Sequence, residues 1–184
     1  MGVGNVLIKT VFSGFGGQGV LMMGYVLAVA GMQGGKNVTF LPAYGAEVRG
    51  GTANCTVAIA DEEIASPVAS SPEFVVVMNQ PSLQRFQNVV QSGGGLFMNS
   101  SMIDSRPIRG DIEIFEVPAN DLAKKLGNDR LTNMVMLGAY LKKTSLAPLE
   151  VTQKAVEEIF KGKGRAIVTQ NKKALRVGYD YMSS

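Results

Sequence analysis

The stretch FSGFGGQG, residues 12–19, is the strongest local indication of the fold in this sequence. The apolar run Val6–Phe12 is rich in β-branched residues and is typical of a strand. The uncharged run Val20–Met32 that follows is typical of a helix. Between the two, three glycines have the spacing of a dinucleotide-binding loop: Gly14, Gly16 and Gly19. The stretch therefore predicts a strand, a tight turn and a helix.

A dinucleotide site also needs a carboxylate about 20 residues further on, at the end of the second strand, to bind the ribose hydroxyls. The predicted second strand, Asn37–Leu41, is followed by Pro42, and the first carboxylate comes at Glu47. This disfavours bound NAD or FAD. Two roles remain open for the glycines: they allow tight turning and close packing, or the helix start attracts an anionic group of a ligand or partner.

The remaining elements alternate between strand and helix patterns. Further strands are predicted at Ala53–Ala60, Phe74–Met78, Leu96–Met98 and Ile112–Val117. Further helices are predicted after an Asn79 cap with Pro81 in the first turn, after a cap at Asn120 or Asp121, and at Thr132–Lys142, Pro148–Phe160 and Arg165–Met182. This order predicts an α/β fold: a single Rossmann-like domain, residues 1–184, with an open, mostly parallel sheet and helices on both faces.

The composition excludes several kinds of site. The chain has no histidine and Cys55 as its single cysteine, so it cannot form an intrachain disulfide or a zinc or iron-sulfur site from its own Cys and His residues. We predict no metal ligands in it, and no pattern assigns a catalytic residue. Cys55 lies in an alternating strand without a basic neighbour, so we expect a buried, unreactive thiol.

The charge and hydropathy patterns also exclude classes of partner. The net charge is only +3, and the basic residues near the C-terminus lack interleaved aromatics, so we expect a solvated helix face and no nucleic-acid binding. The uncharged helix runs for about 13 residues, short of the roughly 20 that cross a bilayer. The N-terminus has no signal-peptide pattern, so we expect a cytoplasmic protein.

The helix Val20–Met32 is apolar nearly all round, whereas a helix on a sheet normally shows a polar stripe to water. We expect it to be mostly buried. Its outer side needs a cover, either the C-terminal helices of this chain or another subunit, and we expect an apolar patch larger than a few hundred Å² on the isolated chain.

The loop PAYGAEVRGG, residues 42–51, combines large side chains with glycines that permit unusual backbone. One interpretation is a surface ion pair between Glu47 and Arg49, which adds little stability. The other is a ligand or subunit contact in which Arg49 donates two hydrogen bonds to a carboxylate or phosphate.

Several motifs in order resemble one known family. FSGFGGQGV, PAYGAEVRGGTANCTVAIADEEIASP and VVMNQPSL are similar to the gamma subunit of the 2-oxoacid:ferredoxin (acceptor) oxidoreductases, the pyruvate/ketoisovalerate oxidoreductase family. RGGTANCTV and MNQPSL resemble its 2-oxoglutarate branch. The likeness covers roughly Val11–Ser100, and later residues match more loosely, mainly through Asn133-Met134.

The resemblance implies a subunit of a complex that converts a 2-oxoacid and coenzyme A to acyl-CoA and carbon dioxide. It implies alpha, beta and delta (ferredoxin-like) partner subunits, ferredoxin or another electron acceptor, and thiamine diphosphate and iron-sulfur clusters that the other subunits hold. The motif positions carried over as binding residues are Gly14, Gly16, Gly17, Gln18 and Gly19, and then Tyr44, Glu47, Arg49, Gly50, Gly51 and Thr52. No catalytic step is assigned to any of them.

Two alternatives stay open beside this hypothesis. One is a free-standing NAD- or FAD-binding oxidoreductase, and the other is an assembly module that binds no small molecule. On the leading hypothesis the isolated chain is inactive, binds no cluster and is able to self-associate, while the identity of the 2-oxoacid depends chiefly on other subunits.

Overall fold

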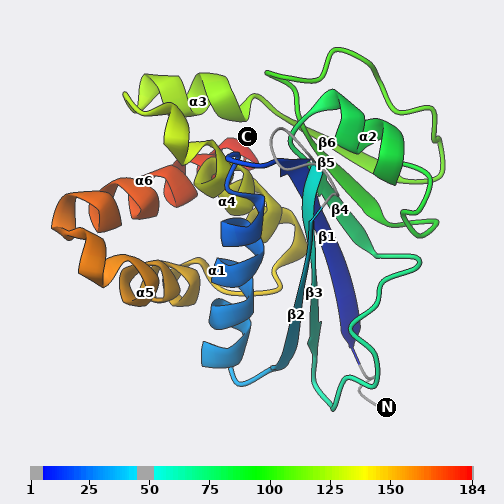
Figure 1. The fold of residues 1–184 in the computed structure, drawn as a ribbon, viewed down its shortest axis with the longest axis horizontal. Helices are drawn as coiled ribbons and strands as arrows, with labels where there is room; N and C mark the ends of the chain where they lie inside the picture. The colour runs from blue at the N-terminus through cyan, green and yellow to red at the C-terminus, as the bar shows by residue number, and fades with distance from the viewer. Residues whose placement is uncertain (1–5, 45–51, 184) are drawn as a thin grey trace.

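A computed structural model describes residues 6–44 and 52–183, and within them six strands form one sheet (Figure 1). The strand order is β2-β3-β1-β4-β5-β6. The strands are β1 (Leu7–Phe15), β2 (Asn37–Tyr44), β3 (Thr52–Ala60), β4 (Phe74–Val77), β5 (Gly95–Asn99) and β6 (Glu113–Val117).

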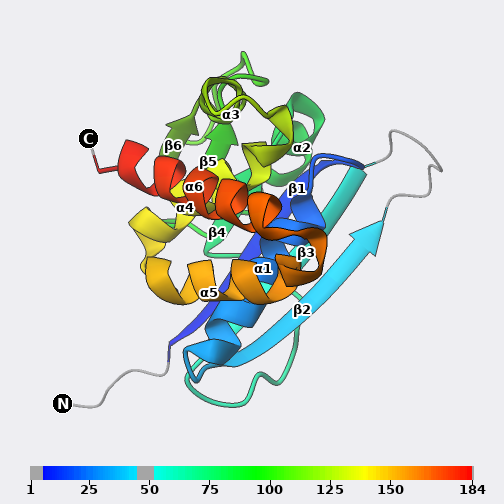
Figure 2. The ribbon, with the colours of Figure 1, turned by 90° about the vertical axis from the view of Figure 1, so that its left-hand side faces the viewer.

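The described residues also contain six α-helices and two short 3-10 turns. The α-helices are α1 (Val20–Gln33), α2 (Gln80–Phe86), α3 (Ala119–Lys125), α4 (Thr132–Thr144), α5 (Leu149–Phe160) and α6 (Arg165–Tyr181), and the turns are η1 (Asp129–Leu131) and η2 (Lys161–Lys163). α1, α4, α5 and α6 gather on one side of the sheet, and α2 lies on the other (Figures 1 and 2). The predicted α/β fold with helices on both faces is confirmed.

The sheet is mixed, because β3 runs against both of its neighbours. β1, β4, β5 and β6 pair in parallel, whereas β3 is antiparallel to β1 and to β2. A parallel pair needs a crossover connection of roughly a dozen or more residues. Only residues 45–51 separate β2 from β3, so these strands form an antiparallel pair, and the predicted mostly parallel arrangement holds for the other half of the sheet.

Helix α1 packs closely on β2 and β3, as its apolar sequence predicts. Most of its residues are buried, and two of its glycines face the sheet. A Cβ atom at Gly24 would lie 2.4 Å from Sγ of Cys55, and one at Gly31 would lie 2.9 Å from Cγ2 of Val38. α5 and α4 cover part of the side of α1 that faces away from the sheet. The C-terminal helices of this chain are therefore one cover of α1, as one of the two alternatives above expects.

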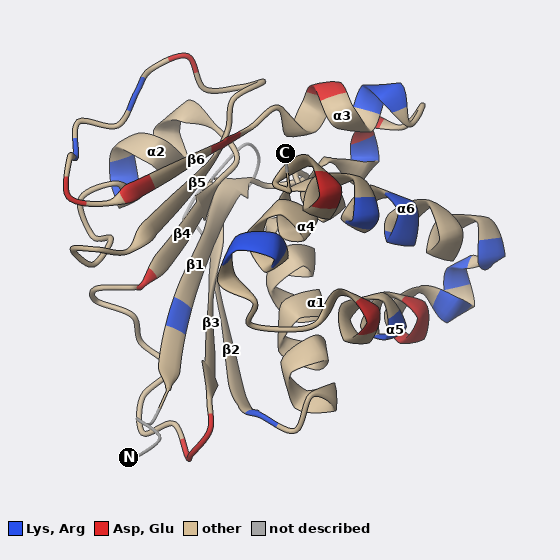
Figure 3. Cartoon of the chain, turned by 180° about the vertical axis from the view of Figure 1, so that it is seen from behind, with Lys and Arg blue, Asp and Glu red and all other residues tan. Residues whose placement is uncertain are grey.

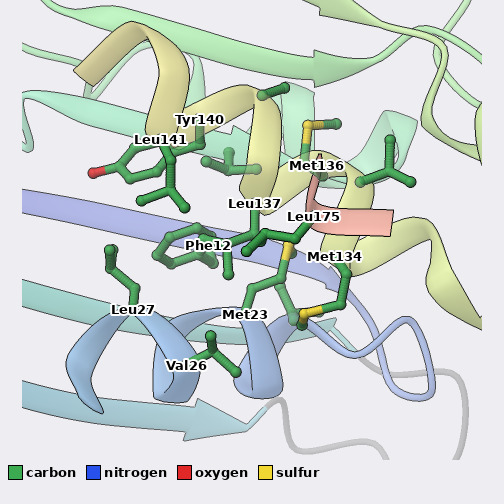
Figure 4. Close-up of a cluster of buried hydrophobic side chains, with 14 of the residues drawn as sticks. Phe12, Met23, Val26, Leu27, Met134, Met136, Leu137, Tyr140, Leu141 and Leu175 are labelled. Atoms are coloured by element: carbon green, nitrogen blue, oxygen red, sulfur yellow. The ribbon is translucent and has the colours of Figure 1, made fainter. Parts of the chain in front are cut away.

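The main core fills the space between the sheet and the helical layer. Phe12 from β1, Met23 from α1 and Leu137 from α4 point toward one another there (Figure 4). Tyr140 is fully buried in this core, and its hydroxyl lies 2.6 Å from Oγ1 of Thr10. A smaller core on the other face joins β4 and β5 to α2 through residues that include Val75, Val77, Leu83, Leu96 and Met98.

Of the two helix caps that the sequence predicts, the structure has one. Asn79 caps α2 as expected: its Oδ1 accepts a hydrogen bond of 3.0 Å from the Ser82 amide. The predicted cap of α3 is wrong, because α3 begins one residue after Pro118 and its cap makes no side-chain hydrogen bond. Asn120 instead accepts from Nδ2 of Asn99 at 2.7 Å, so a tertiary contact uses the oxygen that a local cap would need.

The last helix, α6, faces the core along one stripe of small and apolar residues and one asparagine. Ile167 is 38% exposed, whereas Asn171, Ala174, Leu175 and Gly178 are buried. Among the described residues, no helix is both long and apolar enough to cross a membrane.

Candidate binding cleft at the glycine loop

The glycine loop is a tight turn between β1 and α1. The Gln18 amide donates to the carbonyl of Phe15 at 3.1 Å, which closes the turn. Gly17 has a φ of 96° and Gly19 a φ of 72°, both in the left-handed region that side chains disfavour. The turn therefore needs glycine at these two positions for its backbone geometry.

The side chain of Gln18 fastens this loop to the end of β4. Its Oε1 accepts from the Phe15 amide at 2.7 Å and from Nδ2 of Asn79 at 2.8 Å. A Cβ atom at Gly14 would lie 2.7 Å from the same Oε1 and 3.0 Å from Cβ of Met78. The absence of a side chain at Gly14 thus leaves room for the Gln18 side chain. That side chain forms its hydrogen bonds with the loop itself and with Asn79.

Gly19 is held from the other side by α4. Nδ2 of Asn133 donates to the Gly19 carbonyl at 3.2 Å, and a Cβ atom at Gly19 would lie 2.3 Å from that nitrogen. The resemblance had pointed to Asn133, and the structure shows what it contacts. The start of α1 and the start of α4 are therefore joined.

A cleft of about 330 Å³ opens beside this junction. It is lined by Gly17, Gln18, Gly19, Met78, Asn120, Asp129, Arg130 and Thr132. Met78 follows β4 directly, and the loop follows β1, so the cleft lies beyond the carboxyl ends of two parallel strands. Ligands of open α/β sheets usually bind at this edge.

The charge around the cleft favours an anionic group. α1 and α4 both begin there, and neither carries an acidic residue in its first turn; at α4 the Met134 amide already donates to Oδ1 of Asn133 at 2.9 Å, so α1 has the freer amides. The free amides of a helix start attract negative charge. Arg130 is exposed and forms no ion pair with another residue in the described ranges, whereas Asp129 beside it reduces the positive potential.

The cleft contains groups for binding rather than for covalent chemistry. Thr132 is the one lining hydroxyl among the described residues, and it donates to the Asp129 carbonyl at 2.8 Å. The lining residues Asn120, Asp129, Arg130 and Thr132 lie more than 100 positions after the loop, and sequence reasoning did not find them. Asn133-Met134 was the one signal that pointed to their vicinity.

Thr52, from the described part of the second predicted motif, lies at the same edge of the sheet and is not among the residues that line the cleft. Thr52 pairs with Phe15 across β3 and β1, next to the start of the glycine loop. Its Oγ1 accepts from Nη1 of Arg85 at 3.2 Å, so it contacts α2. The backbone of Tyr44 ends β2. The predicted positions Glu47, Arg49, Gly50 and Gly51 lie outside the described residues.

The single cysteine is buried, as predicted. Cys55 is 0% exposed, and its Sγ lies 3.7 Å from the Val20 carbonyl. Burial raises the pKa of the Cys55 thiol to about 12, so the thiolate that binds metals or attacks substrates does not form at neutral pH. Within the ranges 6–44 and 52–183, no three His, Cys, Asp or Glu residues are grouped to hold a metal ion.

Comparisons with known proteins agree with the motifs. Residues 9–181 match the family model described as pyruvate ferredoxin/flavodoxin oxidoreductase. Ketoisovalerate oxidoreductase subunit VorA of Methanothermobacter thermautotrophicus is 38% identical over 176 residues, which are 95% of this chain and 36% of VorA. This chain therefore spans about a third of the VorA length. The 2-oxoglutarate synthase subunit KorC of Methanothermobacter marburgensis is 33% identical, over 79% of this chain and 82% of KorC.

Solved structures share the fold. The gamma subunit of a keto/oxoacid ferredoxin oxidoreductase from Geobacter sulfurreducens aligns with a TM-score of 0.81 at 25% identity, over 96% of this chain and 98% of that subunit. A 2-oxoglutarate:ferredoxin oxidoreductase from Magnetococcus marinus aligns with a TM-score of 0.86 at 20% identity, over 97% of this chain and 31% of that one, and shows the fold alone. The resemblance found in the motifs is confirmed: the chain belongs to the pyruvate ferredoxin/flavodoxin oxidoreductase family.

Proposed function

We propose that this chain is the gamma subunit of a thiamine-diphosphate-dependent 2-oxoacid:ferredoxin (acceptor) oxidoreductase. The observation that carries the proposal is the match of residues 9–181 to the family, together with relatives of similar length that are themselves subunits. The complex would convert a 2-oxoacid and coenzyme A to acyl-CoA, carbon dioxide and reduced acceptor. The motifs RGGTANCTV and MNQPSL and the KorC relatives favour 2-oxoglutarate, whereas VorA is named for ketoisovalerate.

In this proposal the chain supplies no redox centre. A four-iron cluster is normally held by four cysteine thiolates, and this chain has one cysteine, which is buried. Thiamine diphosphate and the clusters would be bound by alpha, beta and delta subunits, and thiamine diphosphate would supply the carbanion chemistry of decarboxylation. The chain would contribute binding surface to the assembled enzyme.

The cleft at the glycine loop would contribute a contact for coenzyme A. Coenzyme A carries phosphate groups, and two helix starts with the Arg130 guanidinium suit a phosphate. The cleft volume of about 330 Å³ is at the lower end of small-molecule pockets, which hold roughly 300–1,000 Å³. It therefore suits a phosphate-bearing end of the molecule, and the rest would lie against a partner subunit.

Steady-state kinetics of the complex test this contact. Arg130→Gln should raise the KM for coenzyme A by about tenfold to a hundredfold and leave the KM for the 2-oxoacid unchanged, because a charge-assisted hydrogen bond contributes roughly 1.5–3 kcal/mol. Arg106→Gln is the matched control, since Arg106 is exposed and does not line the cleft. Equal KM values for both variants and the wild type would reject the coenzyme A contact and favour an assembly module.

Purification tests the subunit role itself. A tagged chain should retain the other subunits when it is isolated from the organism that encodes it, and the assembled preparation should oxidise 2-oxoglutarate faster than pyruvate or 2-ketoisovalerate. The chain alone should be inactive. Turnover by the lone chain with NAD or FAD would instead support the free-standing oxidoreductase, although the described strand β2 contains no carboxylate.

Arg49 remains a predicted contact of the second motif. Arg49→Ala should leave the melting temperature of the isolated chain unchanged, because a surface ion pair contributes roughly 0 to 1 kcal/mol. It should weaken subunit retention or raise the KM for coenzyme A, and Arg49→Lys should rescue only part of the loss. Wild-type behaviour of both variants would show that Arg49 is an ordinary surface residue.

A further inference from the structure

The edge of the sheet beside the cleft carries side-chain amides and no charge. Residues 10–35, 74–84 and 86–103 include the carboxyl ends of β1, β4 and β5, and they contain no Asp, Glu, Lys or Arg. Figure 3 shows no charged residue at the end of β1, whereas α3 carries both signs of charge. A carboxamide has an oxygen acceptor on one side and N–H donors on the other, so its orientation decides which of them it presents. Four carboxamide side chains are linked at this edge: Gln18, Asn79, Asn99 and Asn120.

The backbone carbonyl of Met78 orients two of these amides. A carbonyl oxygen can only accept hydrogen bonds, so the groups beside it must present nitrogen. Nε2 of Gln18 lies 3.5 Å from this oxygen, and Nδ2 of Asn99 lies 3.4 Å from it. The orientation of Gln18 is fixed a second time, because its Oε1 accepts from the Phe15 amide. Both side chains therefore turn their nitrogen toward the Met78 carbonyl.

Asn99 sets the orientation of Asn120 in turn. Nδ2 of Asn99 also donates to Oδ1 of Asn120, at 2.7 Å. Because Asn99 presents a donor, Asn120 must present its oxygen to that donor, and the amide nitrogen of Asn120 is directed away from Asn99. Asn120 lines the cleft, and its Nδ2 donates to no residue in the ranges that the structure describes. The N–H donors of Asn120 are therefore left for a ligand.

Asn99 is an unexpected residue for a buried position. Its side chain is fully buried, and within the described part of the chain its Oδ1 has no hydrogen-bond partner. Most buried polar atoms are hydrogen-bonded, because an unpaired one lowers the stability of the fold. An apolar side chain would avoid that loss, but it could not donate to Asn120. The unpaired oxygen is thus the consequence of using the Asn99 amide to orient Asn120.

The donors around the cleft match a group that only accepts hydrogen bonds. The Asn120 amide, the second hydrogen of Gln18 Nε2 and the Arg130 guanidinium are all donors, and all three residues line the cleft. The oxygens of an ionised phosphate are strong acceptors. An adenine ring, by contrast, also carries an amino group that needs an acceptor. The carboxylate among the lining residues, Asp129, is exposed and lies next to Arg130 in the chain.

We infer that Asn120 donates hydrogen bonds to a phosphate group of coenzyme A and that Asn99 is the residue that positions it. The inference rests on the proposed function, because that function places coenzyme A at this cleft. It adds an uncharged donor for the phosphate and the buried amide that orients this donor. Coenzyme A carries phosphate on its ribose and in its pyrophosphate link, and either phosphate offers the same acceptor oxygens.

Steady-state kinetics of the assembled complex test the contact. Asn120→Ala should raise the KM for coenzyme A by about tenfold or more and leave the KM for the 2-oxoacid unchanged, because a charge-assisted hydrogen bond is lost. Asn120→Asp should raise it further, because a carboxylate has no donor and repels the phosphate. Asn88→Ala is the matched control, since Asn88 is exposed and does not line the cleft.

Dephospho-coenzyme A, which lacks the ribose phosphate, identifies the phosphate that Asn120 contacts. If Asn120→Ala raises the KM for coenzyme A but not for dephospho-coenzyme A, the contact is with the ribose phosphate. If Asn120→Ala raises both KM values equally and Asn120→Asp raises both further, the contact is with the pyrophosphate.

A double-variant cycle tests the positioning role of Asn99. Asn99→Ala should raise the KM for coenzyme A by about threefold to tenfold, because the Asn120 amide is then free to turn. When Asn120 is already alanine, the same change should have no further effect on that KM, since no amide remains to be oriented. Asn99→Leu, which fills more of the same space without a donor, should behave like Asn99→Ala. The melting temperature of each variant verifies its fold.

The outcomes separate this inference from the proposed contact. If both Asn120 variants keep the wild-type KM while Arg130→Gln raises it, the inference is overturned and the coenzyme A contact stands. If none of the three changes the KM, both fail. If Asn120→Asp has a KM equal to or below that of Asn120→Ala, the bound group is a donor such as the adenine amino group, and the phosphate assignment is overturned. Additive effects of the Asn99 and Asn120 variants would overturn the positioning role.

Discussion

The glycine loop and the helices around it use glycine for different reasons. At Gly17, φ is 96° and a Cβ atom would meet open space, so the backbone conformation is what requires glycine. At Gly24 in α1 and Gly178 in α6, a Cβ atom would lie 2.4 Å from Sγ of Cys55 and 1.8 Å from the carbonyl oxygen of Val135. There the missing side chain is what allows two elements to approach.

This difference bears on what the glycine spacing means. In a dinucleotide fold, the third glycine of the loop lets the helix pack on the strand. Here Gly24 and Gly31 within α1 provide that close approach to β3 and β2, whereas Gly19 faces Asn133 of α4. The spacing of the glycines therefore indicates a tight turn and does not by itself indicate a nucleotide-binding site. What makes the loop a candidate site is its place beside the cleft.

The largest effect is expected for Gly178→Ala. Alanine favours a helix over glycine by about 1 kcal/mol, but here its Cβ would overlap the α4 backbone, so we expect a net loss of about 3 kcal/mol in the free energy of unfolding. Thermal unfolding should show a fall of roughly 6–12 °C in Tm. Gly162→Ala is the control, because a Cβ atom there meets nothing within 4 Å. Equal Tm values for the two variants would contradict close packing of α4 on α6.

A smaller loss is expected for Gly24→Ala, because its nearest neighbour is a side chain. The new methyl group would press on Sγ of Cys55, at a cost of about 2 kcal/mol. Cys55→Ala removes that sulfur, so the double variant should lose less stability than the sum of the two single variants. Strict additivity in denaturant unfolding would show that Gly24 is not needed for the approach of α1 to β3.

Gly17→Ala should act through the backbone alone. Its φ of 96° is unfavourable for alanine, and we expect a loss of roughly 1 kcal/mol without any steric overlap. Gly110→Ala, also in open space but without a positive φ, should be close to neutral. A Gly17→Ala variant as stable as the Gly110→Ala variant would remove the conformational role assigned to the loop.

The smallest effect concerns the thiol beneath Gly24. Burial raises the Cys55 pKa from 9.0 to about 12, so the folded chain keeps its proton where the unfolded chain loses it. The unfolded state then binds fewer protons, and stability falls as pH rises above 9.0, by roughly 0.8 kcal/mol at pH 9.5. Cys55→Ala should lack this component when unfolding is measured at pH 7 and 9.5. If the free energy of unfolding changed equally with pH in the wild type and in Cys55→Ala, the Cys55 thiol would ionise as readily in the folded chain as in the unfolded one.

Local patterns were sufficient to predict most elements but not the candidate site. The strand, turn and helix at residues 6–33, the Asn79 cap and the buried Cys55 all follow from periodicity and residue type, and the structure has them. Arg130 and Thr132 were missed because only folding brings the start of α4 to the glycine loop. Asn120 was misassigned as a cap because its side-chain oxygen accepts a hydrogen bond from Asn99, the last residue of β5.

The α/β class, the tight turn at residues 14–19, the lack of cluster ligands and the family could all be inferred from the residues alone, because these depend on local spacing and residue type. Three further features became visible only in the folded chain: the reversed direction of β3, the joining of α1 to α4 through Gly19 and Asn133, and the side of α1 that stays exposed. Each of these depends on contacts between residues far apart in the chain. Such contacts form when apolar surface is buried in three dimensions, and neither periodicity nor local residue preference records which distant partner a residue will meet.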